Sequence, residues 1–168
     1  MAIRTELEVD LLECSAPVDG QYPLQFVPIE SAGADEKLRF PAGTEGAQRE
    51  INILLGSNIQ AGRLIVGVTR SLPGNWTSWL PHEHAAILEE IYVYVDSRRR
   101  LSACSSRIRM RISPAEIEVV REGDAVLLPA GYHPNVSIPG SSLNYVWIIA
   151  ARREVVDRKW GVVDPRYG

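Results

Sequence analysis

Short strand-like runs, separated by turn residues, constrain this chain more than any other feature. The runs are rich in Val, Ile and Tyr and are bounded by Gly, Pro, Asn or Ser; they span residues 63–70, 90–95, 117–120, 124–130 and 144–152. Residues 106–113 (SRIRMRIS) alternate strictly between polar and apolar side chains. Turn residues recur roughly every 8–12 positions, which is typical of an antiparallel barrel or sandwich. The pattern predicts an all-β fold.

The chain has 168 residues, which predicts one domain with a sizeable core. Residues 115–124 (AEIEVVREGD) also suit a short helix, but they lead into a Gly-Asp turn and another β run. We expect an N-terminal extension of edge strands and loops over 1–47, a barrel over 48–160 and a tail over 161–168.

Composition excludes several classes of function. The net charge of −3 argues against a nucleic-acid partner or an anionic membrane. The apolar runs are too short for a membrane span, and the charged N-terminus does not resemble a signal peptide. Cys14 and Cys104 form no metal-binding or disulfide pattern. We therefore expect a cytoplasmic protein.

The three histidines of the chain indicate a metal site. His82 and His84 are two apart, so on an extended segment both side chains point to the same side. Glu89 and Glu90 follow at the start of the next strand run, and His133 follows a later strand, which can lie beside the first. A single histidine is more often structural, but the spaced pair favours ligands of a divalent ion.

Three imidazoles and one carboxylate leave coordination positions open for water or substrate, as in catalytic metal sites. Zinc is the expected metal, and manganese, iron and nickel are the alternatives.

Two motifs resemble those of the cupins. "PHEHAAILEEIYVY" resembles the first cupin motif, and "GDAVLLPAGYH" resembles the second, except that one residue, Tyr132, separates Gly131 from His133 where two are usual. Longer blocks, "RLIVGVTRSLPGNWTSWLPHEH" and "GYHPNVSIPGSSLNYVWIIAA", resemble the 5-deoxy-glucuronate isomerases of inositol catabolism. These are related to the 4-deoxy-L-threo-5-hexosulose-uronate isomerases of pectin breakdown. The resemblance runs from about residue 48 to about residue 153.

The resemblance implies a single cupin β-barrel, a double-stranded β-helix or jelly roll, with an N-terminal extension. It implies a short form that matches mainly the C-terminal, metal-binding half of two-barrel relatives. His82, His84 and His133 take the positions of the metal ligands. Strand register selects Glu90 as the fourth ligand, whereas counting from the second histidine selects Glu89; we expect Glu90, because register is harder to shift.

The implied activity is aldose–ketose isomerisation of a sugar acid, either 5-deoxy-glucuronate or a related uronate. Such a reaction moves a proton between adjacent carbons through an enediolate, and a divalent metal stabilises the developing oxyanion. Glu89 and Tyr132 are the expected catalytic residues. Glu83 and Tyr92 are further candidates, although tyrosines on these runs also suit barrel packing.

A sugar acid also needs a cation for its carboxylate. Arg107, Arg109 and Arg111 alternate on one face of their strand, but a solvated outer face explains them more simply. Trp76 and Trp79 suit either the mouth of a pocket or an aromatic core.

Two other functions fit the same ligands: a single-domain cupin dioxygenase using Fe(II), and a non-catalytic protein that binds a sugar acid through its metal. Strand edges left uncovered by the absent half would favour a homo-oligomer, either a dimer or a larger assembly.

Overall fold

A computed structural model describes residues 4–84, 86–96, 103–107, 116–159 and 162–163. Strands account for nearly all of its regular structure, so the all-β expectation is confirmed. In chain order the elements are α1 (Ile29–Gly33), β1 (Arg39–Ala42), β2 (Arg49–Leu55), β3 (Leu64–Ser71), β4 (Trp76–Thr77), β5 (His82–Glu83), β6 (Leu88–Val95), β7 (Ala103–Arg107), β8 (Glu116–Val120), β9 (Ala125–Leu128), β10 (Asn135–Ser137), β11 (Asn144–Ala151) and β12 (Val162–Val163).

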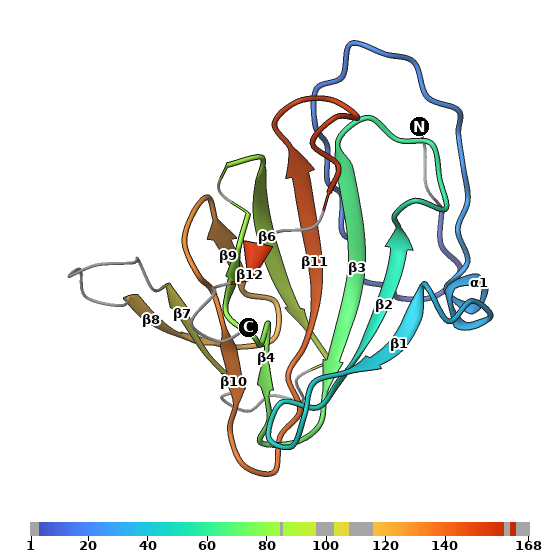
Figure 1. Ribbon diagram of the computed structural model, residues 1–168. Coiled ribbons are helices and arrows are strands. Elements are labelled where there is room, and N and C mark those ends of the chain that lie inside the picture. The colour runs from blue at the N-terminus through green and yellow to red at the C-terminus, as the bar shows by residue number, and fades with distance from the viewer. Residues whose placement is uncertain (1–3, 85, 97–102, 108–115, 160–161, 164–168) are drawn as a thin grey trace.

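The described strands form two main antiparallel sheets (Figure 1). One has the order β1-β2-β3-β11-β6-β9, and the other has the order β4-β10-β7-β8. A small third sheet pairs β12 with β5. The stretch that also suited a helix, 115–124, contains strand β8 and the turn that leads into β9.

The inner face of the six-stranded sheet carries the core and positions the site. Along β6, burial alternates with a period of two, so Leu88, Glu90, Tyr92 and Tyr94 all face inward. The register places these residues in rows with the inward residues of the neighbouring strands. The rows on β3, β11 and β6 are Thr69–Tyr145–Tyr94, Gly67–Trp147–Tyr92 and Ile65–Ile149–Glu90.

Gly67 is required in the middle row because it faces the indole of Trp147. A Cβ at residue 67 would lie 2.1 Å from Cζ2 of Trp147 and 2.4 Å from the backbone oxygen of Asn52. The missing side chain therefore leaves room for the indole of Trp147 close to the backbone of β3. Trp147 is 5% exposed and joins the hydrophobic core.

The N-terminal segment, residues 4–28, contains no helix or strand and runs outside the sheet (Figure 1). Glu154 anchors it by accepting hydrogen bonds from the backbone N–H of Asp19 at 2.7 Å and of Gly20 at 3.1 Å, and from the Tyr22 hydroxyl. Within the expected extension the structure also has α1 and β1, and β1 pairs with β2.

No helix in the described part of the chain is long and apolar enough to cross a membrane. Arg109 and Arg111 lie outside the described residues, and only the backbone of Arg107 is described.

Replacing Gly67 by Ala should lower the free energy of unfolding by about 1–3 kcal/mol, because the added methyl group overpacks the core against a backbone atom. Chemical denaturation measures this change. The control is Gly33→Ala, where the added Cβ meets only the flexible end of Arg39 at 3.3 Å. Equal stability of the two variants would contradict the packing described.

Candidate functional site

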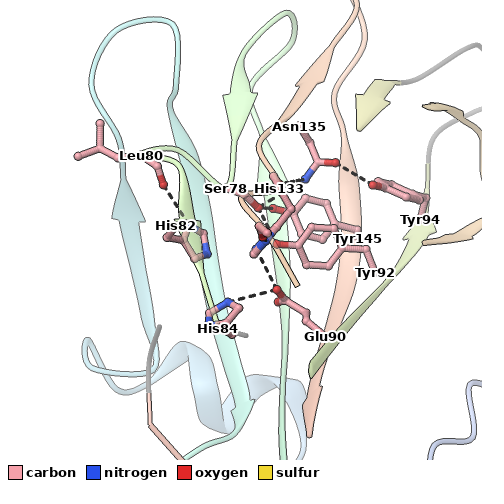
Figure 2. Close-up of polar contacts among 11 residues, drawn as sticks. Ser78, Leu80, His82, His84, Glu90, Tyr92, Tyr94, His133, Asn135 and Tyr145 are labelled. Carbon is pink, nitrogen blue, oxygen red and sulfur yellow. Dashed lines mark hydrogen bonds and ion pairs between the residues drawn. The ribbon is translucent and has the colours of Figure 1, made fainter. Parts of the chain in front are cut away.

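Three separate segments bring the histidines and one glutamate together (Figure 2). His82 lies on the short strand β5, and His84 follows it. Glu90 lies on the inner face of β6, and His133 lies between β9 and β10. His84, Glu90 and His133 are 7%, 4% and 2% exposed, so the cluster is shielded from solvent on most sides.

The ligand atoms of the three histidines lie within 4.8 Å of one another. Glu90 Oε2 lies 3.2 Å from His84 Nε2 and 3.0 Å from His133 Nε2. Two ligands that each lie about 2.1 Å from one ion are at most about 4.2 Å apart. Small side-chain rotations therefore bring the histidine nitrogens to coordination distance.

Backbone carbonyls orient two of the three imidazoles. Nδ1 of His82 lies 3.0 Å from the Leu80 oxygen, and Nδ1 of His133 lies 3.0 Å from the Gly131 oxygen. In the tautomer that donates these hydrogen bonds, Nε2 has a free lone pair directed to the centre of the cluster. Metal-binding histidines are typically held in this way by their second ring nitrogen.

The electrostatics favour the protonation states that bind metals. Burial lowers the pKa of His82 to about 4, and the nearby His133 adds to this effect, so the His82 ring is neutral at neutral pH. Burial alone would raise the pKa of Glu90, but its contacts with His133 and His84 outweigh burial and lower the pKa to about 2. A neutral imidazole and an ionised carboxylate are the metal-binding forms.

Unsatisfied polar atoms indicate that these residues fit a metal ion. Both ring nitrogens of His84, Nε2 of His133 and Oε2 of Glu90 are buried without a hydrogen-bond partner in the described structure. Their short separations lack hydrogen-bond geometry. Leaving several buried polar atoms unpaired is costly, and a cation at their centre would satisfy Oε2 of Glu90, Nε2 of His133 and one ring nitrogen of His84 together.

A cavity of about 310 Å³ opens beside the cluster. Its volume suits a small molecule. The lining combines aromatic walls with a few polar groups: Arg49, Ile51, Thr69, Ser78, Trp79, Leu80, His82, His84, Glu90, Tyr92, Tyr145, Trp147 and Ile149.

Ser78 links two tyrosines in the wall of this cavity. Its Oγ lies 2.7 Å from the hydroxyl of Tyr92 and 3.1 Å from that of Tyr145. Burial raises the pKa of both phenols, and for Tyr92 the nearby Glu90 raises it further. Both hydroxyl groups are therefore protonated at neutral pH.

Asn135 and Tyr94 hold the backbone at His133 in place through two hydrogen bonds. Asn135 donates from Nδ2 to the backbone oxygen of His133 at 3.2 Å, and its Oδ1 accepts a hydrogen bond from Tyr94 at 2.8 Å. All three residues are almost completely buried. These bonds fix the segment that carries the third histidine.

The structure separates the two candidate glutamates. Glu90 faces inward beside the histidines, whereas Glu89 is exposed on the opposite face of β6 and is not brought to the cavity. Tyr132 is buried but is not among the cavity-lining residues. Trp79 lines the cavity, and its neighbour Trp76 is 39% exposed.

Sequence reasoning missed Arg49 and Ser78 as cavity residues. A signal for Arg49 was present, because Arg49, Ile51 and Ile53 alternate on β2 and share its inward face. Recognising it required knowing that β2 belongs to the same sheet as β6, which depends on contacts distant in the sequence.

Known isomerases match most of the chain. The 5-deoxy-glucuronate isomerase of Geobacillus thermodenitrificans is 29% identical over 164 residues, which cover 85% of this chain and 53% of the relative. The 5-deoxy-glucuronate isomerase of Bacillus licheniformis is 29% identical over 168 residues, which cover 93% of this chain and 56% of the relative. The chain thus spans about half the length of these relatives.

Solved structures support a cupin fold. An IolB-like protein from Salmonella typhimurium has a TM-score of 0.77 at 23% identity, covering 89% of this chain and 56% of that protein. A cupin-2 domain from Rhodospirillum rubrum has a TM-score of 0.51 at 13% identity, covering 89% of this chain and 82% of that domain. The model of the KduI/IolB family matches residues 1–166, well beyond the resemblance at 48–153. Because that match includes nearly every residue, this chain belongs to the KduI/IolB family.

Proposed function

We propose that this protein is a metal-dependent isomerase that interconverts the aldose and ketose forms of a sugar acid. The substrate class is a uronate such as 5-deoxy-glucuronate, which would place the reaction in inositol or related carbohydrate catabolism. The observation that carries the proposal is the convergence of His82, His84, His133 and Glu90 beside a cavity large enough for a small molecule. The names of the relatives supply the reaction type.

The four residues would hold a divalent ion, with zinc as the expected metal. When bound, the ion supplies Lewis-acid polarisation of a carbonyl and stabilises negative charge that develops on oxygen. Glu90 and the neutral ring of His82 provide the negative charge and a lone pair that such an ion needs. Trp79 and Trp147 flank the cavity and restrict the access of water.

The hydroxyl groups of Tyr92 and Tyr145 would supply hydrogen bonds to the oxygen atoms of the substrate. Both line the cavity, and Ser78 holds them at a fixed separation. Glu90 precedes Tyr92 by two residues on the same strand face, so the Tyr92 side chain is next to the metal-binding cluster. We assign Tyr92 as the donor to the reacting oxygen.

The proposal is tested by following isomerisation in deuterium oxide. The metal-loaded protein is mixed with a panel of uronates without oxygen, and proton NMR detects product and solvent deuterium on carbon. We expect conversion with deuterium incorporation, loss of activity after chelation, and recovery when a divalent metal is restored. Turnover that requires both oxygen and Fe(II) would contradict the proposal and favour a dioxygenase. Tight binding without exchange would instead identify a binding protein.

Replacing Glu90 by Gln should weaken metal binding strongly, because Glu90 is proposed to bind the ion directly. The loss should exceed the roughly 10- to 100-fold that is typical when a residue that only hydrogen-bonds to a metal ligand is replaced. His84→Ala should have a similar effect and leave the fold largely intact. Metal content after dialysis, together with circular dichroism, measures both effects. Glu89→Gln is the matched control, since it removes the neighbouring exposed carboxylate from the outer face of the same strand. Full metal content in Glu90→Gln would refute the ligand set.

Replacing Tyr92 by Phe should lower kcat roughly 100-fold by removing a hydrogen-bond donor to the reacting oxygen. Metal content should not change, because Tyr92 is outside the ligand set. Steady-state kinetics and elemental analysis measure the two quantities on the same preparation. An unchanged kcat would show that Tyr92 serves only in packing.

A further inference from the structure

Arg49 presents a cation to the cavity. The side chain is half-buried, and it donates from Nη1 to the Ala47 oxygen at 2.9 Å and from Nη2 to the Trp79 oxygen. Both acceptors are neutral carbonyls, and no ion pair of Arg49 is present among the described residues. A guanidinium has five N–H donors, so capacity for an anion remains.

The fold holds the guanidinium firmly in this position. Arg49 begins β2 and pairs with Ala42 of β1 and Ser71 of β3. The turn between β1 and β2 passes through Gly43, which has φ of 87°. A Cβ at Gly43 would lie 2.7 Å from Nη1 of Arg49 and 1.9 Å from the Ala47 oxygen, so only glycine permits this close approach.

Arg49 and the histidine cluster occupy different parts of the same inner face. Arg49 is in register with Ser71, the last residue of β3. Glu90 is in the row of Ile149 and Ile65, which is near the beginning of β3. The cavity lining includes both Arg49 and Glu90. It therefore suits a molecule with an anionic group at one end and an oxygen ligand for a metal at the other.

We propose that Arg49 binds the carboxylate of the substrate and sets the specificity for sugar acids over neutral sugars. The inference rests on the proposed function for the identity of the anion. A uronate carries its carboxylate at the opposite end of the carbon chain from its carbonyl, and the cavity lining offers Arg49 for the first and the metal-binding cluster for the second. A guanidinium recognises a carboxylate through paired, charge-assisted hydrogen bonds.

The alternative role for Arg49 is structural. Its bond to the Trp79 oxygen reaches the segment that leads to His82, so loss of Arg49 can also disturb the metal cluster. The two roles differ in what they change. A purely structural role alters metal content and stability, and it weakens charged and neutral ligands equally.

The test measures binding of glucuronate and of its uncharged amide, glucuronamide, to the metal-loaded protein by calorimetry. Wild type should bind glucuronate more tightly. In Arg49→Gln the preference should fall roughly 10- to 100-fold, since a hydrogen bond to a charged group is lost, while metal content stays the same. Arg49→Lys should retain part of the preference. The control Arg39→Gln removes an exposed guanidinium on the neighbouring strand and should behave like wild type.

Equal affinity of wild type for the two probes would overturn the inference, as would an unchanged preference in Arg49→Gln. Loss of metal in Arg49→Gln, with both probes weakened equally, would assign Arg49 to the structural role and also overturn it. Binding requires no turnover, so the outcome is independent of the isomerase assay. If the preference depends on Arg49 but no uronate is isomerised, the proposed function fails and the carboxylate site remains.

Discussion

The site depends on a buried carboxylate that faces imidazole rings. Glu90 is 4% exposed, and its Oε2 lies 3.2 Å from Nε2 of His84 and 3.0 Å from Nε2 of His133. An ionised carboxylate in such surroundings is costly unless positive charge compensates it. Among the described residues, no lysine or arginine pairs with Glu90, so a cation from outside the chain could supply this charge.

The antiparallel sheet makes this arrangement possible. Because side chains alternate along β6, the strand that buries Glu90 also buries Tyr92 and Tyr94 on the same face. The neighbouring strand β11 adds Tyr145, Trp147 and Ile149 in register, and these residues form the wall of the cavity and the adjoining core. The histidine–glutamate cluster, the cavity and the core are therefore parts of one continuous surface.

Local patterns explain why much of the fold and the candidate site could be predicted. The alternation of side chains in 90–95 and the turn residues between strands are short-range signals, and so is the spacing of His82 and His84. Strand register likewise distinguishes Glu90 from Glu89, which lies on the opposite face. Strand alternation also places Glu89 on the exposed face of β6, and its role as a catalytic residue stays a prediction.

The remaining site residues depend on contacts between distant segments. Arg49 reaches the cavity only because β2 lies beside β3, and Ser78 contacts Tyr145 across 67 positions of sequence. The arginines at 107, 109 and 111 form a clear local alternation, whereas the arginine that lines the cavity, Arg49, stands alone after a turn. The order of strands in the sheet, rather than any local pattern, places Arg49 at the cavity.

The candidate metal ligands come from segments that meet only when the sheets have assembled, since His82, Glu90 and His133 lie on β5, on β6 and after β9. An unfolded chain cannot present this geometry, so a bound ion favours the native state by mass action. At a free metal concentration 100 times the dissociation constant, this linkage is worth about 2.7 kcal/mol. A metal held at this site would thus lower the fraction of molecules that is unfolded at any moment, to an extent set by the free metal concentration.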